Sequence, residues 1–241
     1  MYKKIGNKIL FPDNEMFEIL KPVAYGSHSD IFKARIDKDM CAIKKYNWVY
    51  NEDKENIERK IAINIDSYIT PEWLLYIRGK FDGYIMPFCR GKDLEKRKLD
   101  ISIDEFSSST DKLMDDTHKL SLLNFNIYDT FISNVMYDEG FKMVDTDDYP
   151  YVPELSLDEI EHLNSLRLNQ MLTDIFLKNA NLGNLYFQNV EFKKFIKKCE
   201  DGEFLFKEMF DLLCGIAQNE ENGQLVKVSE VGKVLSKVKK M

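Results

Sequence analysis

Short apolar and β-branched runs alternate with turn-forming residues through the first part of the chain. The turn signals are Gly26-Ser27 and Asp37-Lys38-Asp39, and short runs bounded by such turns are typical of β-strands. The period then changes, because Ile57, Ile61 and Ile65 recur every four residues with charged residues between them, which indicates a helix. We expect three strands at 17–23, 30–36 and 40–46, a helix at 51–68, and two strands at 73–77 and 83–88.

The rest of the chain is dominated by helical patterns. Phe106, Leu113 and Leu120 fall on one face of a helix expected at 104–120. A β-rich front and a helical back predict an α+β protein of two lobes, with the boundary expected between residues 88 and 89. A hairpin at 135–137 and 141–144, turned by Asp138-Glu139-Gly140, interrupts the helices, and further helices are expected at 155–177, 190–198, 203–218 and 229–239.

The composition is that of a folded, acidic chain. Apolar residues make up 44% of the 241 positions and charged residues 31%, with a net charge of −7. These apolar and charged fractions are ordinary for a globular protein. Binding to nucleic acid without sequence preference needs a basic surface, so this charge disfavours a nucleic-acid partner.

No apolar stretch approaches the ~18–20 residues that span a bilayer, and the first eleven residues lack the apolar core of a signal peptide. We therefore expect a cytoplasmic protein without a membrane span. Four cysteines lie far apart with no C-x-x-C pair, and three histidines are scattered. Reduced thiols and no zinc site are the expectation.

Four motifs lie along this framework and carry its candidate chemistry. A glycine-containing turn, Ala24-Tyr25-Gly26-Ser27-His28-Ser29, joins two expected strands, and Cys41-Ala42-Ile43-Lys44 lies in the next strand. Tyr84-Ile85-Met86-Pro87-Phe88-Cys89 forms the end of the last strand. The fourth motif runs from Asn126-Ile127-Tyr128-Asp129 through Asn134 to Lys142-Met143-Val144-Asp145 across the hairpin. Taken in order, these motifs resemble the signature set of protein kinases of the serine/threonine type.

The resemblance implies a two-lobed kinase-like fold, with ATP bound in the cleft between a small antiparallel-sheet lobe and a mostly helical lobe. Gly26, Ser27 and Ser29 would lie in the phosphate-binding loop, of whose three glycines only the middle one is present. Ala42 and Lys44 match V-A-I-K, whose lysine reaches the α- and β-phosphates.

The third motif resembles the fifth strand and hinge of a kinase, where the adenine ring bonds to the backbone. Met86 would line the back of the adenine pocket, and Phe88 and Cys89 would form the hinge. The lysine of the second motif also needs an acidic partner from the following helix. Glu58 is our choice, and Glu55, one turn earlier and on nearly the same face, is the competitor.

The fourth motif keeps the aspartate and asparagine of the catalytic loop at the family's separation of five residues. The resemblance implies that Asn134 and Asp145 bind Mg²⁺ and that Asp129 accepts the proton of the acceptor hydroxyl. A calcium loop beginning at Asp145 fails on its chemistry, because Ser156 stands where the bidentate glutamate should be.

Several positions depart from the family pattern. Ile127 and Tyr128 replace the histidine and arginine of H-R-D, Phe131 stands where a lysine usually steadies the γ-phosphate, and Thr146-Asp147 replaces the Phe-Gly of D-F-G. These losses weaken phosphate transfer more than nucleotide binding. No arginine of the loop is left to pair with a phosphorylated activation segment.

Three functions agree with these motifs. The first is an ATP- and Mg²⁺-dependent phosphotransferase that acts on a serine or threonine hydroxyl of a protein substrate. The second is a pseudokinase, a nucleotide-binding interaction module that lacks turnover. The third is a small-molecule kinase of the aminoglycoside phosphotransferase type. A further hypothesis gives the motifs no function: the chain would be an α+β binding protein that is unrelated to kinases and binds no nucleotide.

Overall fold

The computed structural model describes residues 3–5, 8–10, 16–36, 38–48, 51–61, 63–77 and 79–238. The α+β class expected from the sequence is confirmed. The chain divides into two compact units. The first comprises Met1–Arg90 with Asp145–Asp147, and the second comprises Gly91–Val144 with Asp148–Met241. The main division falls two residues beyond the expected boundary, and Asp145–Asp147 belongs with the first unit because its side chains are bonded there.

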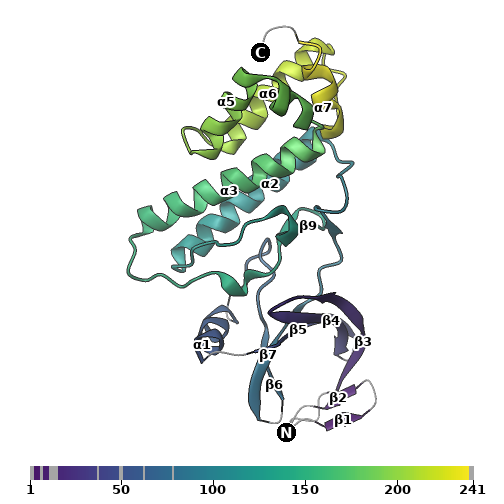
Figure 1. The fold of residues 1–241 in the computed structure, drawn as a ribbon, viewed down its shortest axis with the longest axis vertical. Coiled ribbons are helices and arrows are strands. Elements are labelled where there is room, and N and C mark those ends of the chain that lie inside the picture. Colours follow the sequence, from purple (N-terminus) through teal and green to yellow (C-terminus); the bar gives the residue numbers. More distant parts are fainter. Residues whose placement is uncertain are drawn as a thin grey trace. The chain divides into compact units, whose positions relative to one another are not determined.

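In the described part of the chain, the first unit is built on a seven-stranded antiparallel sheet (Figure 1). Its strands are β1 (Lys3–Ile5), β2 (Lys8–Leu10), β3 (Met16–Tyr25), β4 (Ser29–Ile36), β5 (Asp39–Tyr46), β6 (Trp73–Ile77) and β7 (Lys80–Pro87). Their order in the sheet is β1-β2-β3-β4-β5-β7-β6. Strand β5 is therefore an inner strand, paired with β4 on one side and β7 on the other.

Alternation along β5 sends its side chains to two different surroundings. Cys41 and Ile43 are buried with residues of β4, β6 and β7 on one face. On the other face, Ala42 and Tyr46 are buried with Tyr84 and Met86 of β7 and with Ile57 of the helix that follows β5. Because residues two apart on a strand share a face, Lys44 lies on the face of Ala42 and Tyr46.

The helix after β5 is shorter than the pattern predicted. Helix α1 spans Asn51–Lys60, whereas we expected a helix over 51–68. Beyond it, Ile63 and Ile65 are buried with the exposed Asn64 between them, and a turn follows in which the N–H of Tyr68 donates to the carbonyl of Ile65 at 2.9 Å. A recurrence of four is also a multiple of two, so the isoleucine spacing could not distinguish a helix from an extended segment, and β-branched isoleucine favours extended backbone.

The second unit holds the hairpin and the helices (Figure 1). Among its described residues, β8 (Lys92–Asp93), β9 (Val135–Tyr137) and β10 (Phe141–Met143) form a small sheet in the order β10-β9-β8. The helices are α2 (Ile103–Leu122), α3 (Leu157–Asn179), α4 (Gly183–Gln188), α5 (Val190–Glu200), α6 (Phe206–Glu220) and α7 (Val228–Leu235). Lys239, the end of the last expected helix, lies outside the described residues.

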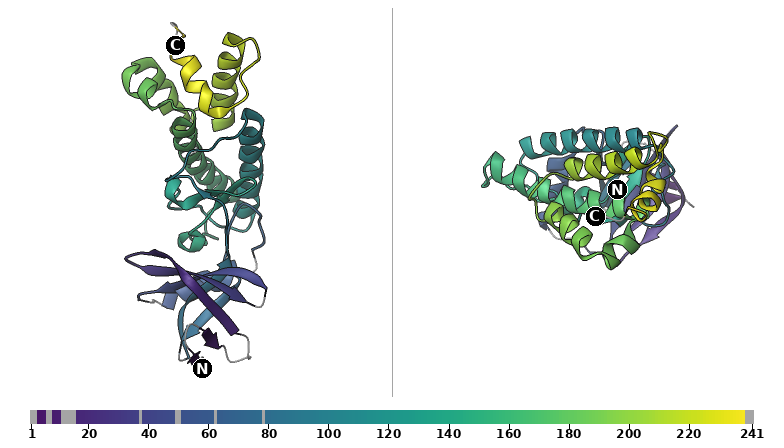
Figure 2. Two further views of the ribbon diagram at one scale, coloured as in Figure 1. Left: turned by 90° about the vertical axis from the view of Figure 1, so that its right-hand side faces the viewer. Right: turned by 90° about the horizontal axis from the view of Figure 1, so that it is seen from above.

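The two longest helices are fixed at their starts by local chemistry. Ser102 before α2 and Ser156 before α3 each form a capping box with the glutamate three residues later. The two helices lie side by side (Figure 1, Figure 2). Among the described residues, no helix combines the length and the apolar character that a bilayer span requires.

An aromatic core joins the hairpin to the helices. Phe106 of α2 stacks on Phe210 of α6 with 5.1 Å between ring centroids, and it meets Phe176 of α3 edge-on at 5.9 Å. Phe141 of β10 lies against the same ring at 5.2 Å. The hairpin that carries the fourth sequence motif is thus anchored on α2.

Replacing Phe106 with alanine is expected to destabilise the second unit by about 3–5 kcal/mol, because it removes a fully buried ring and leaves a cavity. Urea unfolding of the variant measures the loss. Leu212→Ala on α6 is the control, since Leu212 is 51% exposed and its truncation leaves no cavity. Equal losses in the two variants would show that Phe106 does not have this central role.

Candidate functional site

A buried lysine is the centre of the candidate site. Lys44 of β5 is 5% exposed, and its Nζ donates to Oδ1 and Oδ2 of Asp147 at 2.7 and 2.9 Å. It also donates to Oδ1 of Asp145. Burial would lower the pKa of the ammonium, but the charges of Asp147 and Asp145 outweigh burial and raise the pKa of Lys44 above its ordinary value. Lys44 is therefore a firmly charged group.

Asp147 is the most extensively bonded residue of the site. Besides Lys44, its carboxylate accepts hydrogen bonds from the hydroxyls of Tyr46 at 2.8 Å and Tyr84 at 2.9 Å. Burial would raise the pKa of Asp147, yet Lys44 and the two tyrosine donors lower it overall. The pKa of Tyr84 is raised well above its usual value by burial and by the charge of Asp147, which keeps its hydroxyl a donor. We call Lys44, Tyr46, Tyr84, Asp145 and Asp147 the Lys44 cluster.

Helix α1 is bonded to the main chain of the same segment. Asn56 donates to the carbonyl oxygen of Asp147 at 2.8 Å, and the ammonium of Lys60 donates to the same oxygen. Lys60 is only 1% exposed. In addition, the hydroxyl of Thr146 donates to the carbonyl of Ile69 at 2.9 Å. Segment 145–147 is thus held both by α1 and by the chain that precedes β6.

Asp145 has a different environment from Asp147. Its side chain is 35% exposed, against 5% for that of Asp147. Its pKa is raised by burial and by the neighbouring charge of Asp147, against the opposing effect of Lys44. Its backbone has φ of +62°, in the left-handed region that residues other than glycine rarely adopt. Strained backbone of this kind is concentrated at functional sites.

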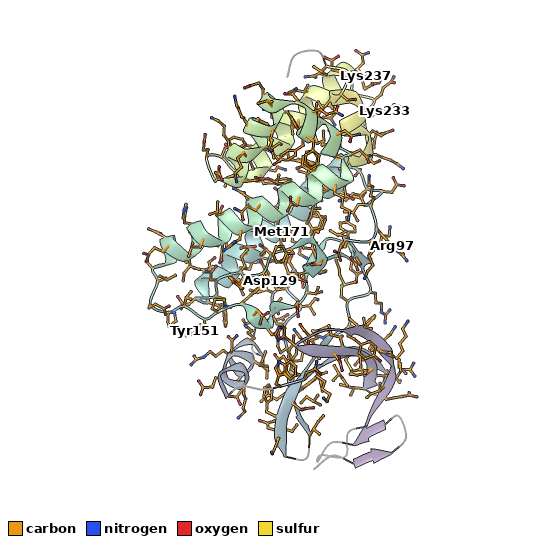
Figure 3. All side chains as sticks on the ribbon, viewed as in Figure 1. Arg97, Asp129, Tyr151, Met171, Lys233 and Lys237 are labelled. Carbon is orange, nitrogen blue, oxygen red and sulfur yellow. The ribbon has the colours of Figure 1, made fainter. Side chains whose placement is uncertain are left out.

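The same backbone conformation occurs at Asp129, on the segment between α2 and β9 (Figure 3). Its φ is +53°, and Nδ2 of Asn134 donates to its carbonyl oxygen at 2.9 Å and to its Oδ2 at 3.2 Å. Within the second unit, the N–H of Val144 donates to the carbonyl of Asn134 at 2.9 Å. The hairpin therefore holds the residue that precedes Asp145 against the residue that orients Asp129.

Two exposed aromatic side chains flank Asp129. Tyr128 is 54% exposed and Phe131 is 65% exposed, and the guanidinium of Arg167 lies 6.0 Å from the centroid of the Tyr128 ring. The chain before Asp129 is fixed by the buried Asn164 of α3, whose side chain accepts from the N–H of Ile127 at 2.7 Å. The surface next to Asp129 is thus aromatic on a rigidly held backbone.

The expected phosphate loop is the turn between β3 and β4. Within it, the N–H of Gly26 donates to the carbonyl of Ser29 at 2.9 Å. Nδ2 of Asn47 donates to the carbonyls of Gly26 at 3.1 Å and Ser27 at 3.3 Å. A Cβ at Gly26 would lie 3.0 Å from the carbonyl oxygen of Ser29. The turn is therefore exposed but ordered by its own hydrogen bonds, and it has little room for a side chain at Gly26.

Three of the residues expected to surround an adenine ring, Ala42, Met86 and Phe88, lie on the face of the sheet that carries Lys44. Ala42 and Met86 are cross-strand partners, 4% and 6% exposed, and Phe88 is packed against their cluster. The N–H of Phe88 donates weakly to the carbonyl of Met40 at 3.4 Å, and Lys33 lies 4.4 Å from the centroid of its ring. Cys89 is half-buried beside it. This apolar surface leads along the sheet toward Lys44.

The expected partner of Lys44 on helix α1 is not the observed one. Glu58 forms an ion pair with Lys54 at 3.1 Å and is exposed, and Glu55 is exposed as well. The side of α1 that is buried carries Ile57 and Lys60 instead. The pairing of Lys44 with Glu58 was therefore wrong for this structure, because the rotation of α1 directs Glu55 and Glu58 to solvent.

Asp147, Tyr46, Tyr84 and Lys60 were not predicted as site residues. One signal was available for the tyrosines, because Tyr46 lies two residues from Lys44 on β5 and Tyr84 is its cross-strand neighbour. A period of three or four from Ile57 also places Lys60 on the buried side of the helix. No local pattern indicates that Asp147 rather than a helical glutamate meets Lys44.

The oxygen atoms near Lys44 suit a magnesium ion that also takes ligands from water and phosphate. They do not suit a metal ion whose ligands all come from the protein. Among the described residues, no group of three or more histidine, cysteine, aspartate or glutamate side chains could hold a metal ion. Mg²⁺ is commonly bound through one or two carboxylates together with waters and phosphate oxygens. The carboxylate of Asp147 is engaged by three donors, whereas that of Asp145 is partly exposed, so within the first unit Asp145 is the carboxylate that fits such a role.

A separate groove of about 520 Å³ lies in the second unit. It is lined by Asp174, Tyr186, Phe187 and Glu200, among other residues of α3, α4 and α5. None of the residues predicted for ATP, metal or catalysis lines it.

No family model matches this sequence, and no curated protein sequence matches it either.

Proposed function

We propose that the chain is an ATP- and Mg²⁺-dependent phosphotransferase that transfers the γ-phosphate to a serine or threonine hydroxyl of a protein. The observation that carries the proposal is the burial of Lys44 on an inner strand, bonded to carboxylates of the segment that follows the hairpin. A buried lysine with two acidic partners is unusual, because removing an ammonium from water is costly unless it is fully paired. The kinase-like order of the sequence motifs supplies the chemical interpretation.

In the proposed reaction, Lys44 binds the α- and β-phosphates of ATP as a fixed positive charge. The raised pKa of its ammonium agrees with this role, since the group stays charged at neutral pH. Ala42, Met86, Phe88 and Cys89 offer the apolar surface and backbone for the adenine ring. Gly26, Ser27 and Ser29 form the turn that would approach the phosphates.

Asn134 and Asp145 would hold Mg²⁺, which neutralises the charge that develops on the transferred phosphate. Asp129 orients the acceptor hydroxyl and takes its proton, and Asn134 fixes Asp129 through its amide. Phosphoryl transfer depends mainly on such positioning and on charge stabilisation. Phe131 offers no charge to the γ-phosphate, so a bound Mg²⁺ would have to supply the positive charge there.

The experiment that tests the proposal is transfer of labelled γ-phosphate from Mg·ATP in the presence of a generic protein substrate. Wild type is compared with Asp145→Ala, and Asp115→Ala, at an exposed position of α2, is the control. We expect label on protein with the wild type and with Asp115→Ala, and at least a 100-fold loss (roughly the weight of a positioned charge) with Asp145→Ala.

A different pattern would favour the pseudokinase. Only one glycine in the loop and an aromatic residue at Phe131 support that alternative. Its signature is ATP that raises the thermal stability of wild type but not of Asp145→Ala, without label on any protein. Neither transfer nor an effect of Mg·ATP on stability would overturn both functions.

A further inference from the structure

The acidic groups that face Lys44 come from one short segment and not from helix α1. Among the described residues, the carboxylates in ion-pair contact with Nζ of Lys44 are those of Asp145 and Asp147. Across the strands, Lys44 faces Tyr84 of β7 and Ile31 of β4. The acidic groups that position this lysine therefore belong to the Asp145–Asp147 segment.

The two aspartates are not equivalent. Asp145 contacts Lys44 through Oδ1 and keeps about a third of its side chain exposed. Both oxygens of Asp147 contact Lys44, and each also accepts a tyrosine hydroxyl, Oδ2 from Tyr46 and Oδ1 from Tyr84. A carboxylate whose oxygens are satisfied in this way cannot readily exchange partners, whereas Asp145 can turn toward a cation.

Helix α1 contributes donors where a glutamate was expected. Lys60 and Asn56 both bond to the carbonyl oxygen of Asp147, so the helix fixes the backbone of Asp147 and not the ammonium of Lys44. A glutamate on the buried side of the helix would place a further negative charge next to Asp147. A lysine in that place instead balances the two aspartates.

We infer that Asp147 is the positioning residue that holds Lys44 in its phosphate-binding place, and that Asp145 is thereby left available to the metal. This inference rests on the proposed function and deepens it. Asp147 acts through Lys44 and touches no reacting atom itself. Helix α1 acts one step further away, through the main chain of Asp147.

Steady-state phosphate transfer with Asp147→Asn tests the inference, with Glu58→Gln as the matched control. Asparagine keeps the size of the side chain but removes the charge that holds Lys44. The KM for ATP should rise and kcat/KM for ATP should fall by about 10–100-fold, the range for losing a group that orients a directly acting one. Glu58→Gln should leave both unchanged, because Glu58 pairs with Lys54 at the surface.

The split between KM and kcat separates positioning from folding. A variant that only folds less completely has fewer active molecules, which lowers the apparent kcat and leaves the KM for ATP unchanged. If Asp147→Asn does not fold, Tyr46→Phe combined with Tyr84→Phe loosens Asp147 while keeping every charge. This double variant should raise the KM for ATP several-fold.

Nuclear magnetic resonance can test the contact between Lys44 and Asp147 in the absence of nucleotide. In protein labelled with ¹⁵N-lysine, the ammonium signal of Lys44, identified by its absence in Lys44→Arg, should be protected from exchange with water in wild type and in Glu58→Gln. It should be lost in Asp147→Asn.

The outcomes distinguish the inference from the function on which it rests. Wild-type transfer with an unchanged KM in Asp147→Asn, or a raised KM in Glu58→Gln, would overturn the inference alone. A wild type that neither transfers phosphate nor binds Mg·ATP would overturn the proposed function and the inference with it.

Discussion

Lys44→Met is expected to abolish phosphate transfer and to destabilise the first unit by about 3–5 kcal/mol, the range for breaking a buried ion pair from one side. The variant leaves Asp147, which is 6% exposed, and Asp145 without the ammonium that bonds to both carboxylates. Urea unfolding measures the stability, and transfer of labelled phosphate per folded molecule measures the activity.

The pH dependence of this variant identifies the cause of its instability. Lys44 lowers the pKa of both aspartates, so its removal raises the pKa of the pair above the 3.8 that is usual for aspartate. A carboxyl group whose pKa is higher in the folded than in the unfolded state adds stability below the unfolded pKa, and this stability is lost as the pH rises. The stability difference between wild type and Lys44→Met should therefore be smaller at pH 5 than at pH 7.

Lys45→Met is the matched control for both measurements. Lys45 is the next residue of β5, lies on the opposite face and forms a long, partly exposed ion pair with Asp82 at 3.7 Å. Its replacement should change the stability by less than about 1 kcal/mol, as expected for a partly exposed pair with such a long separation, and should leave transfer intact. Equal behaviour of the two variants would mean that Lys44 has no special role.

Asp129→Asn should lower phosphate transfer by about 10²–10⁴-fold, the usual contribution of a positioned general base. Asparagine adopts left-handed backbone as readily as aspartate, so the fold and the contact with Asn134 should survive. The KM for ATP should stay near that of wild type, since Asp129 is proposed to act on the acceptor.

The measurement for Asp129→Asn is transfer at saturating Mg·ATP, with Asp115→Asn on the exposed face of α2 as the control. A variant with full activity would remove Asp129 from the role of base. A variant that loses ATP binding together with transfer would instead make Asp129 part of the nucleotide site.

The strands and helices could be predicted largely from the sequence, because most of them are long enough to show their period. The bounds of β5, α2, α3 and the hairpin differ from the expected ones by only a few residues. The three-residue strands β1 and β2 were missed, since so few positions cannot show an alternation. Helix α1 was predicted too long, because a spacing of four residues agrees both with a helix and with an extended segment.

The candidate site was predictable only in part. The alternation along β5 predicts that Lys44 and Lys45 point to opposite faces, and the structure has Lys44 buried and Lys45 partly exposed. The partner of Lys44 depends on how α1 is rotated and on where a segment 103 residues away meets the sheet. Both are properties of tertiary packing, which no local pattern in the sequence encodes.

The left-handed backbone at Asp129 and Asp145 has a consequence for protein engineering. Glycine adopts this conformation without strain, whereas an L-residue there costs on the order of 1–2 kcal/mol. Asp129→Gly should accordingly keep most of the wild-type stability, because the relief of this strain offsets the lost hydrogen bond from Asn134 to Oδ2. Selection of variants for thermal stability alone would not retain the carboxylate, so a screen on this protein should follow activity together with stability.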